Sequence, residues 1–264
     1  MEDNPLSKID FLEGTILLVN KPLRWTSFDV VNKIRYRLRN LYKIKNIKVG
    51  HGGTLDPMAT GLIIIATGKM TKQLQSVLDM QKAYTGTFFV GATTPSYDSE
   101  TEPDEYFEIS DITPEMIEAA REKFMGVQFQ VPPMFSAIKV DGQPLYIKAR
   151  EGEKIEIEPR KVEIFDFKLD RVDLPEIDFD VSCSKGTYIR SLAYDFGKAL
   201  GSGAYLKSLV RTRSGEFLLK DAWELEDLIA KLQELENRGI STKIFVKVMD
   251  YLKKNIETLN FKYL

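Results

Sequence analysis

Apolar residues recur at helical spacing in several stretches of the chain. Ser27 belongs to a residue type that caps helices well, and a helix from there to about residue 42 would bury Val30, Val31, Ile34, Leu38 and Leu41. The same reasoning predicts a helix that Thr113-Pro114 opens and Gly126 ends, and a helix over residues 187–200. Shorter helices are expected over residues 71–78 and 144–150, and helical sequence follows residue 223.

Continuous or alternating apolar runs between these helices predict strands. They cover residues 15–20, 62–66, 82–91, 136–140, 162–169, 177–183 and 205–212. The acidic segment over residues 97–118 is interpreted as a surface loop. Strands and helices are mixed without a regular strand–helix–strand rhythm. This predicts an α+β fold with a mixed, mainly antiparallel central sheet flanked by helices.

A glycine-rich loop precedes the second predicted strand. Residues 50–61 have the sequence Gly-His-Gly-Gly-Thr-Leu-Asp-Pro-Met-Ala-Thr-Gly, and His51 is the only histidine of the chain. Pro57 fixes its own φ and disfavours helical geometry at Asp56. The loop therefore presents one carboxylate at the start of a buried strand, which is a plausible place for an active site. The simpler alternative is an ordinary turn in which Asp56 caps a backbone amide.

Composition excludes several classes of protein. One cysteine, Cys183, excludes an intramolecular disulfide, and one histidine removes the usual ligands of a zinc site. We expect no metal and no cofactor, although a metal held by carboxylates alone stays open. The glycines and Lys69 between residues 61 and 71 do not have phosphate-loop spacing. The acidic N-terminus and the lack of a 20-residue apolar run predict a cytoplasmic protein without a membrane span.

Charge is segregated along the chain, although the formal net charge is only −2. Residues 20–85 hold twelve Lys or Arg against three Asp, whereas residues 97–118 hold nine acidic residues and no basic one. A concentrated basic region is typical of a protein that binds a phosphate backbone. An equally ordinary explanation for Lys33, Arg35, Arg37 and Arg39 is a solvated helix face.

Two further polar clusters stand at predicted element ends. In Lys82-Ala83-Tyr84 the tyrosine could be an ordinary core residue of its strand. Arg190 would lie in the first turn of its helix, which is the unfavourable end for a cation. Its position is easier to explain if a carboxylate faces it.

Together these motifs resemble those of bacterial tRNA pseudouridine-55 synthases of the TruB type. The motifs are Lys21-Pro22 with Thr26-Ser27, the glycine loop, Lys82 with Tyr84 and Gly91, and residues 183–190, Cys-Ser-Lys-Gly-Thr-Tyr-Ile-Arg. They stand in the family's order, and the likeness covers roughly residues 14–215. The resemblance implies the pseudouridine-synthase fold, an isomerase that needs no cofactor, and the T-loop of tRNA as substrate.

The resemblance also implies roles for individual residues. Asp56 becomes the catalytic carboxylate, Arg190 its ion-pair partner, and Tyr84 the ring that stacks on the target uracil and a candidate for proton transfer. His51 becomes a T-loop contact that helps to hold the base flipped out. The remaining RNA contacts would be Lys21, Lys72, Lys82, Tyr146 in the segment 132–152, Lys185 and Tyr188.

The chain departs from the family pattern in two places. Arg24 stands where the family usually has glycine. Many members also end in a small RNA-binding β-domain, the PUA domain, whereas the sequence after Trp223 is helical and rich in Lys and Glu. We therefore expect a catalytic domain over residues 1–220, with an RNA-binding insertion around 130–152, and a helical extension over 221–264. A monomer without an obligate protein partner is expected, and a guide-RNA-dependent relative is disfavoured.

The implied reaction fits this set of side chains. A carboxylate can stabilise or trap the sugar as the base leaves, or attack the ring, and the sequence leaves these routes open. Flipping the base costs a few kcal/mol, and stacking on an aromatic ring returns about 1–3 kcal/mol per base. The competing interpretation is a non-catalytic RNA-binding module. A carboxylate such as Asp56 argues against it, because pure binding has no use for a negative charge facing phosphates.

Overall fold

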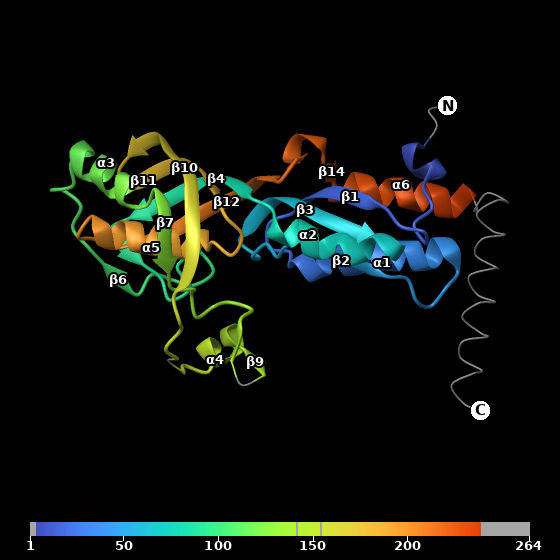
Figure 1. Cartoon of the computed structure of the whole chain (residues 1–264), viewed down its shortest axis with the longest axis horizontal. Helices are drawn as coiled ribbons and strands as arrows, with labels where there is room; N and C mark the ends of the chain where they lie inside the picture. The colour runs from blue at the N-terminus through green and yellow to red at the C-terminus, as the bar shows by residue number, and fades with distance from the viewer. Residues whose placement is uncertain (1–3, 141, 154, 239–264) are drawn as a thin grey trace. The chain divides into compact units, whose positions relative to one another are not determined.

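The strands of the computed structural model form a mixed, mainly antiparallel sheet flanked by helices, which confirms the predicted α+β class. The structure describes residues 4–140, 142–153 and 155–238 (Figure 1). The chain divides into two compact units. Of the described residues, the first comprises 4–56, 62–78 and 219–238, and the second comprises 57–61 and the described part of 79–218. No helix within the described ranges is both long and apolar enough to cross a membrane.

The first unit is built around a short sheet in the order β14-β1-β3, with β2 antiparallel to β3 and β14 parallel to β1. Residues 62–66 of β3 are fully buried, as their apolar run predicts. The elements are η1 (Pro5–Lys8), β1 (Ile16–Lys21), α1 (Ser27–Tyr42), β2 (Val49–His51), β3 (Ala59–Thr67), η2 (Gly68–Gln73), α2 (Leu74–Asp79), η3 (Leu219–Asp221), β14 (Trp223–Glu224) and α6 (Leu225–Arg238).

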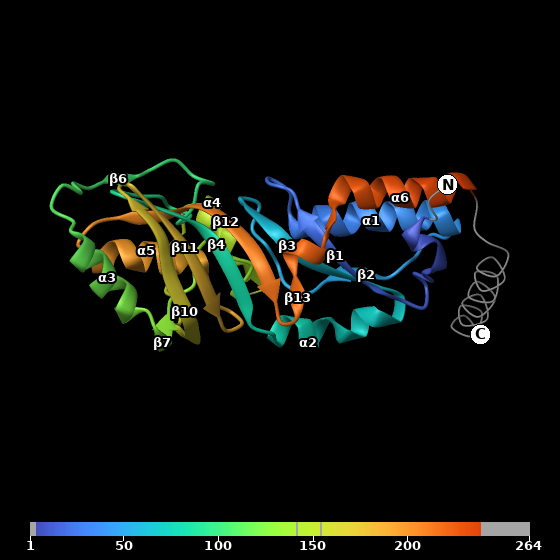
Figure 2. The same ribbon diagram turned by 90° about the horizontal axis from the view of Figure 1, so that it is seen from above.

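Helix α1 has the predicted length and buried face, but its cap is one residue earlier than predicted. Thr26 is the N-cap: its hydroxyl accepts from the backbone N–H of Asp29, and the Asp29 carboxylate accepts from the Thr26 N–H. Helix α6 lies along α1 (Figure 2). Arg37 donates to Gln233 of α6 and lies 3.8 Å from Glu236, so this arginine of the basic region stabilises helix packing.

The second unit carries the larger part of the sheet, in the order β3-β12-β4-β11-β10-β7. Residues 59–61 of β3 pair parallel with β12, and the other ladders in this order are antiparallel. The elements are β4 (Lys82–Val90), β5 (Ala92–Thr93), β6 (Glu105–Tyr106), α3 (Pro114–Lys123), β7 (Gly126–Gln130), β8 (Lys139–Val140), β9 (Gln143–Pro144), α4 (Leu145–Arg150), β10 (Arg160–Asp173), β11 (Glu176–Cys183), α5 (Ile189–Ala199), β12 (Ala204–Ser214) and β13 (Phe217–Leu218).

An aromatic cluster forms the core of the second unit. Phe88 of β4 stacks on Phe179 of β11 with ring centres 4.2 Å apart, and Phe196 of α5 lies 5.5 Å from Phe88. Phe167 of β10 meets the same rings edge-on. Helix α5 is therefore anchored to the sheet by its apolar face, and this fixes the position of its first turn.

The structure differs from the sequence prediction at several strands. β2 and β7 were not predicted. β7 was missed because it begins at Gly126, which was assigned as a helix stop, and because its Val127 and Phe129 are exposed. Of the strand predicted over 136–140, only Lys139–Val140 forms. The helix predicted over 71–78 begins as the 3₁₀ turn η2. The predicted helical sequence beyond Arg238 lies outside the described residues.

Candidate active site

The loop before Asp56 is fixed by Ser27 in the first unit. The Ser27 hydroxyl accepts from the Leu55 N–H at 2.8 Å and donates to the Leu55 carbonyl at 3.1 Å. Both residues are buried, whereas Asp56 is half-buried. A serine predicted as a helix cap therefore holds the residue next to the candidate carboxylate.

Two glycines of the loop are required by close backbone contacts. A Cβ at Gly52 would lie 2.5 Å from the Cγ1 atom of Val77 in α2. Gly61 has φ +102, and its Cβ would lie 2.5 Å from the carbonyl oxygen of Arg211 in β12. Only glycine combines this left-handed conformation with such a close approach. Glycine at these two positions therefore lets the backbone pack closely against Val77 and Arg211, respectively.

The other predicted site residues of the first unit have different environments. His51 is half-buried at the end of β2, opposite Ile65 of β3. Lys72 is exposed in η2. Lys21 is fully buried, and its ammonium donates to the carbonyls of Pro22 at 2.9 Å and Trp25 at 2.6 Å. Lys21 thus holds the loop that leads into α1.

Tyr84 lies in the middle of the second unit's sheet. It is opposite Val181 of β11 and Arg211 of β12, and its relative exposure is 9%. Arg211 is 2% exposed and was not identified as a site residue. No signal for it was present in the sequence, because simple alternation groups Arg211 with the exposed Lys207, and only the irregular register between Leu206 and Ser208 places it inward. Directly paired strand residues face the same side of a sheet, so Arg211 is a neighbour of Tyr84.

Arg190 is a buried cation with a buried acidic neighbour. Its Nη1 donates to the Ser96 carbonyl at 3.2 Å, and its Nε lies 3.7 Å from a carboxylate oxygen of Asp98. The Asp98 carboxylate also accepts from the Ser96 hydroxyl at 2.6 Å and from the Glu100 N–H at 2.9 Å. Arg190 and Asp98 are each 3% exposed. The interpretation of residues 97–118 as a surface loop is therefore wrong at Asp98, which a buried arginine retains in the interior.

The start of α5, where Arg190 lies, is held by Gln130 of β7. The Gln130 amide oxygen accepts from the Tyr188 N–H at 2.8 Å, and its amide nitrogen donates to the Tyr188 carbonyl at 3.1 Å. Tyr188 is the N-cap residue and makes no side-chain cap. A buried glutamine of β7 thus fixes the backbone of the residue that precedes α5, and sequence analysis did not identify it.

Lys82 and Cys183 have shifted protonation equilibria in the second unit. Burial and the nearby charge of Arg211 lower the pKa of Lys82 to about 8. Burial raises the pKa of the Cys183 thiol to about 11. The thiol therefore stays protonated at neutral pH and is not an activated nucleophile.

The remaining predicted contacts lie at the surface of the second unit. Lys185 is exposed in the turn before α5 and forms a 2.7 Å ion pair with Asp79. Tyr188 is half-buried. Tyr146 of α4 is 37% exposed, and the Arg150 guanidinium lies 5.7 Å from its ring centre. Asp56 belongs to the first unit and Arg190 and Tyr84 to the second, so the pairing of Asp56 with Arg190 stays a prediction.

Comparison with known proteins decides the family. The model of the TruB family pseudouridylate synthase N-terminal domain matches residues 39–189, and the model of the tRNA pseudouridylate synthase B C-terminal domain matches residues 190–259. The chain belongs to the TruB family of pseudouridylate synthases. It is 54% identical over 217 residues to a tRNA pseudouridine synthase B of Flavobacterium johnsoniae, covering 82% of this chain and 95% of the relative.

Other relatives agree with this family assignment. A tRNA pseudouridine synthase B of Phocaeicola vulgatus is 48% identical over 228 residues, which cover 86% of this chain and 97% of the relative. A chain in the crystal structure of a Cbf5-Nop10-Gar1 complex is similar with a TM-score of 0.66 and 26% identity. The match covers 94% of the TruB-family chain but 61% of that solved chain. The described fold is thus shared with a larger protein.

Proposed function

We propose that this TruB-family protein isomerises uridine 55 in the T-loop of tRNA to pseudouridine. The observation that carries the proposal is the half-buried Asp56 carboxylate at the end of a loop that Ser27 fixes through both backbone atoms of Leu55. A carboxylate that is held in place but still partly accessible is suited to act on a substrate. The names of the relatives supply the substrate class, tRNA.

The reaction breaks the bond between N1 of uracil and C1′ of the ribose and forms a bond between C5 and C1′. A proton leaves C5 and a proton is gained at N1, so the reaction needs no oxidant and no group donor. Asp56 supplies the negative charge that stabilises or traps the sugar, or attacks the ring. Arg190 keeps Asp56 ionised and directed, and Tyr84 stacks on the flipped uracil and is the candidate for the proton transfer at C5.

The RNA contacts divide into direct and indirect ones. The exposed Lys72 and Lys185 and the partly exposed Tyr146 and Tyr188 contact the RNA directly. His51 contacts the T-loop and helps to hold the base flipped out. Lys82 adds positive charge in the second unit. Lys21 is fully buried, so it acts on RNA through the loop that it holds.

The organisation around this site is also part of the proposal. Residues 1–220 carry catalysis, the insertion around 130–152 binds RNA, and residues 221–264 are a C-terminal extension whose described part contains α6. The protein acts in the cytoplasm as a monomer. Packing of α6 against α1 supports a stabilising function for the described part of this extension.

Incubation with an unmodified tRNA transcript tests the proposal. Pseudouridine is mapped by its chemical adduct and reverse transcription, and one modified position in the T-loop is expected. A transcript with cytidine at that position is the matched control and should stay unmodified. Tight tRNA binding without any pseudouridine would contradict the proposal and favour a non-catalytic RNA-binding module.

A further inference from the structure

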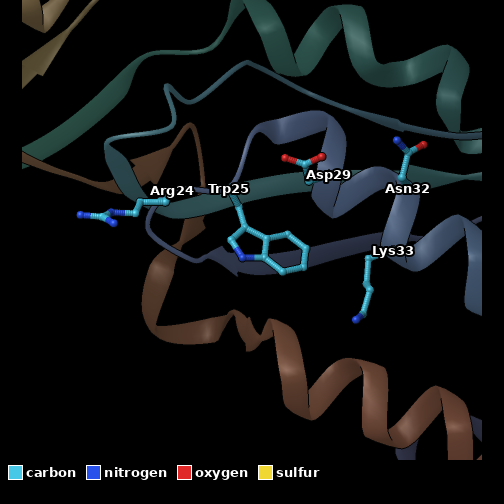
Figure 3. A pocket seen from close by; sticks show the side chains of 5 residues that line it. All are labelled: Arg24, Trp25, Asp29, Asn32 and Lys33. Carbon is cyan, nitrogen blue, oxygen red and sulfur yellow. The ribbon is translucent and has the colours of Figure 1, made fainter. Parts of the chain in front are cut away.

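A pocket of the first unit is lined by residues for which neither the family match nor the proposed chemistry assigns a function. It has a volume of about 420 Å³ and is lined by Arg24, Trp25, Asp29, Asn32 and Lys33 (Figure 3). Ligand pockets typically have volumes of about 300–1,000 Å³. The lining combines one indole ring with two cations and one carboxylate.

The indole is presented by a backbone that a buried charge holds in place. The fully buried Lys21 ammonium donates to the Trp25 carbonyl at 2.6 Å and to the Pro22 carbonyl at 2.9 Å. A buried ammonium is costly and has to be compensated by hydrogen bonds. A buried cation therefore fixes the backbone of the short loop that carries Arg24 and Trp25. A loop that only connected two elements would not need this interaction.

Arg24 adopts a conformation that disfavours any side chain. Its φ is +66, in the left-handed region that glycine enters without cost and other residues enter at about 1–2 kcal/mol. The pattern that the chain otherwise follows usually has glycine here. The loop thus keeps the left-handed conformation while it carries a long basic side chain. The conformation alone assigns no function, since Lys43 at the end of α1 has φ +55, so the case for Arg24 rests on its place in the lining of the pocket.

The polar groups around the indole favour an anionic ligand with a flat ring. The Lys33 ammonium lies 5.9 Å from the centre of the Trp25 ring. The Asn32 amide oxygen accepts from Arg35, so its nitrogen is the group that can donate to a ligand. The Asp29 carboxylate accepts from the Thr26 backbone N–H and hydroxyl, which stabilises the N-terminus of α1.

We propose that this pocket binds one nucleotide of the RNA substrate next to the target uridine. The base stacks on Trp25, and the phosphodiester lies between Arg24 and Lys33. The loop has a direct link to the catalytic loop, because Ser27, two residues after Trp25, binds both backbone atoms of Leu55 beside Asp56. The proposal rests on the proposed function, which supplies the RNA substrate and its target uridine.

Replacing Arg24 by glycine separates strain from binding. Arg24→Gly removes one cation and relieves the left-handed strain, so thermal stability should hold or rise while T-arm stem-loop RNA binds several-fold more weakly. The slope of log affinity against log salt should become shallower by about 0.7, as expected for one phosphate contact. Lys43→Gly is the matched control, because Lys43 is exposed, ends α1 and has φ +55. Equal losses for both variants would overturn the proposal, since a general charge effect would then be sufficient.

Fluorescence reports directly on the indole. The chain has two tryptophans, so the signal that is lost in Trp25→Phe belongs to Trp25. Stem-loop RNA should quench this difference signal, and Trp25→Ala should weaken binding about tenfold, in keeping with one lost stacking contact. Unchanged Trp25 fluorescence in a saturated RNA complex would overturn the proposal. Quenching without pseudouridine formation would instead refute the proposed function and leave the nucleotide site standing.

Discussion

The Asp56 loop of the first unit and the Arg190 region of the second are held by different kinds of interaction. Asp56 is half-buried, and the loop before it is fixed by uncharged hydrogen bonds from Ser27, 28 residues earlier. Arg190 is buried and lies against Ser96 and Asp98, more than 90 residues away in the chain. Both regions thus depend on tertiary contacts, but the loop of the carboxylate is held by neutral hydrogen bonds, whereas the buried cation needs a buried carboxylate beside it.

The difference predicts how substitutions in each region affect stability and activity. Removing one member of a buried ion pair costs about 3–5 kcal/mol, because the other charge stays buried without compensation. Removing a buried hydrogen-bond partner costs about 1–3 kcal/mol. Damage around Arg190 should therefore affect folding and activity together, while damage to the Asp56 loop should affect mainly activity.

The largest effect is expected at the buried pair. Arg190→Ala should abolish pseudouridine formation almost completely. Asp98→Asn should lower it at least tenfold and lower the free energy of unfolding by about 3 kcal/mol, because it removes the charge beside Arg190. Turnover assays and urea unfolding measure the two quantities. Asp104→Asn is the control, since this exposed residue of the same acidic segment binds Thr93. Equal behaviour of the two asparagine variants would show that Asp98 has no special function.

A smaller effect is expected from loosening the Asp56 loop. Ser27→Ala leaves the backbone N–H and carbonyl of Leu55 without their hydroxyl partner and should cost about 1–3 kcal/mol of stability. Turnover should fall about tenfold, because Asp56 is positioned less well, while tRNA affinity stays close to that of the wild type. Ser76→Ala is matched to it, as that exposed hydroxyl of α2 donates to the backbone carbonyl of Gln73 at the end of η2. A loss of tRNA affinity as large as the loss of turnover would argue against a positioning function.

A more gradual effect, spread over the pH scale, concerns the pH dependence of stability. The pKa of Lys82 is lowered to about 8, whereas in the unfolded chain it stays near its ordinary value of about 10.5. Between these values the native state binds fewer protons than the unfolded state, so Lys82 makes stability rise with pH, by at most about 1.4 kcal/mol per pH unit. Below pH 8 its buried charge destabilises the fold.

The matched measurement is urea unfolding of the wild type and Lys82→Met from pH 7 to 10. The raised pKa of Cys183 acts in the opposite direction, and Lys82 itself lowers that pKa, so the same pair is also compared in a Cys183→Ala background, which removes this titration. The wild-type free energy of unfolding should rise relative to that of the variant above pH 8. Parallel profiles would show that Lys82 is not a destabilising buried cation.

Local patterns predicted much of the fold. The apolar spacing gave the buried face of α1, the continuous run gave the core of β3, and Thr113-Pro114 marked the start of α3. Strand β7 could not be recognised, because an edge strand with exposed Val127 and Phe129 has no inward apolar pattern. The predicted N-cap is one residue too late, because Thr26 and Ser27 are both good capping residues. In the structure Thr26 caps α1, while the Ser27 hydroxyl is bonded to the backbone of Leu55.

The site was predictable only where its residues belong to a motif. Asp56, Tyr84 and Arg190 stand in family motifs, but Asp98 lies in an acidic stretch that resembles a solvated loop. Its burial depends on a pairing across more than 90 residues, which one sequence does not contain. Arg211 could not be identified either, because alternation groups it with the exposed Lys207 until the irregular register after Leu206 is known.

Parallel measurement of tRNA binding and pseudouridine formation by Asp56→Asn tests the central claim most directly. The variant keeps the size of the side chain and removes its charge and nucleophile, so the loop should still fold. Affinity should hold or rise, because one negative charge no longer faces the RNA, and pseudouridine formation should fall below detection. Turnover by Asp56→Asn at a rate close to that of the wild type would contradict the assignment of Asp56 as the catalytic carboxylate.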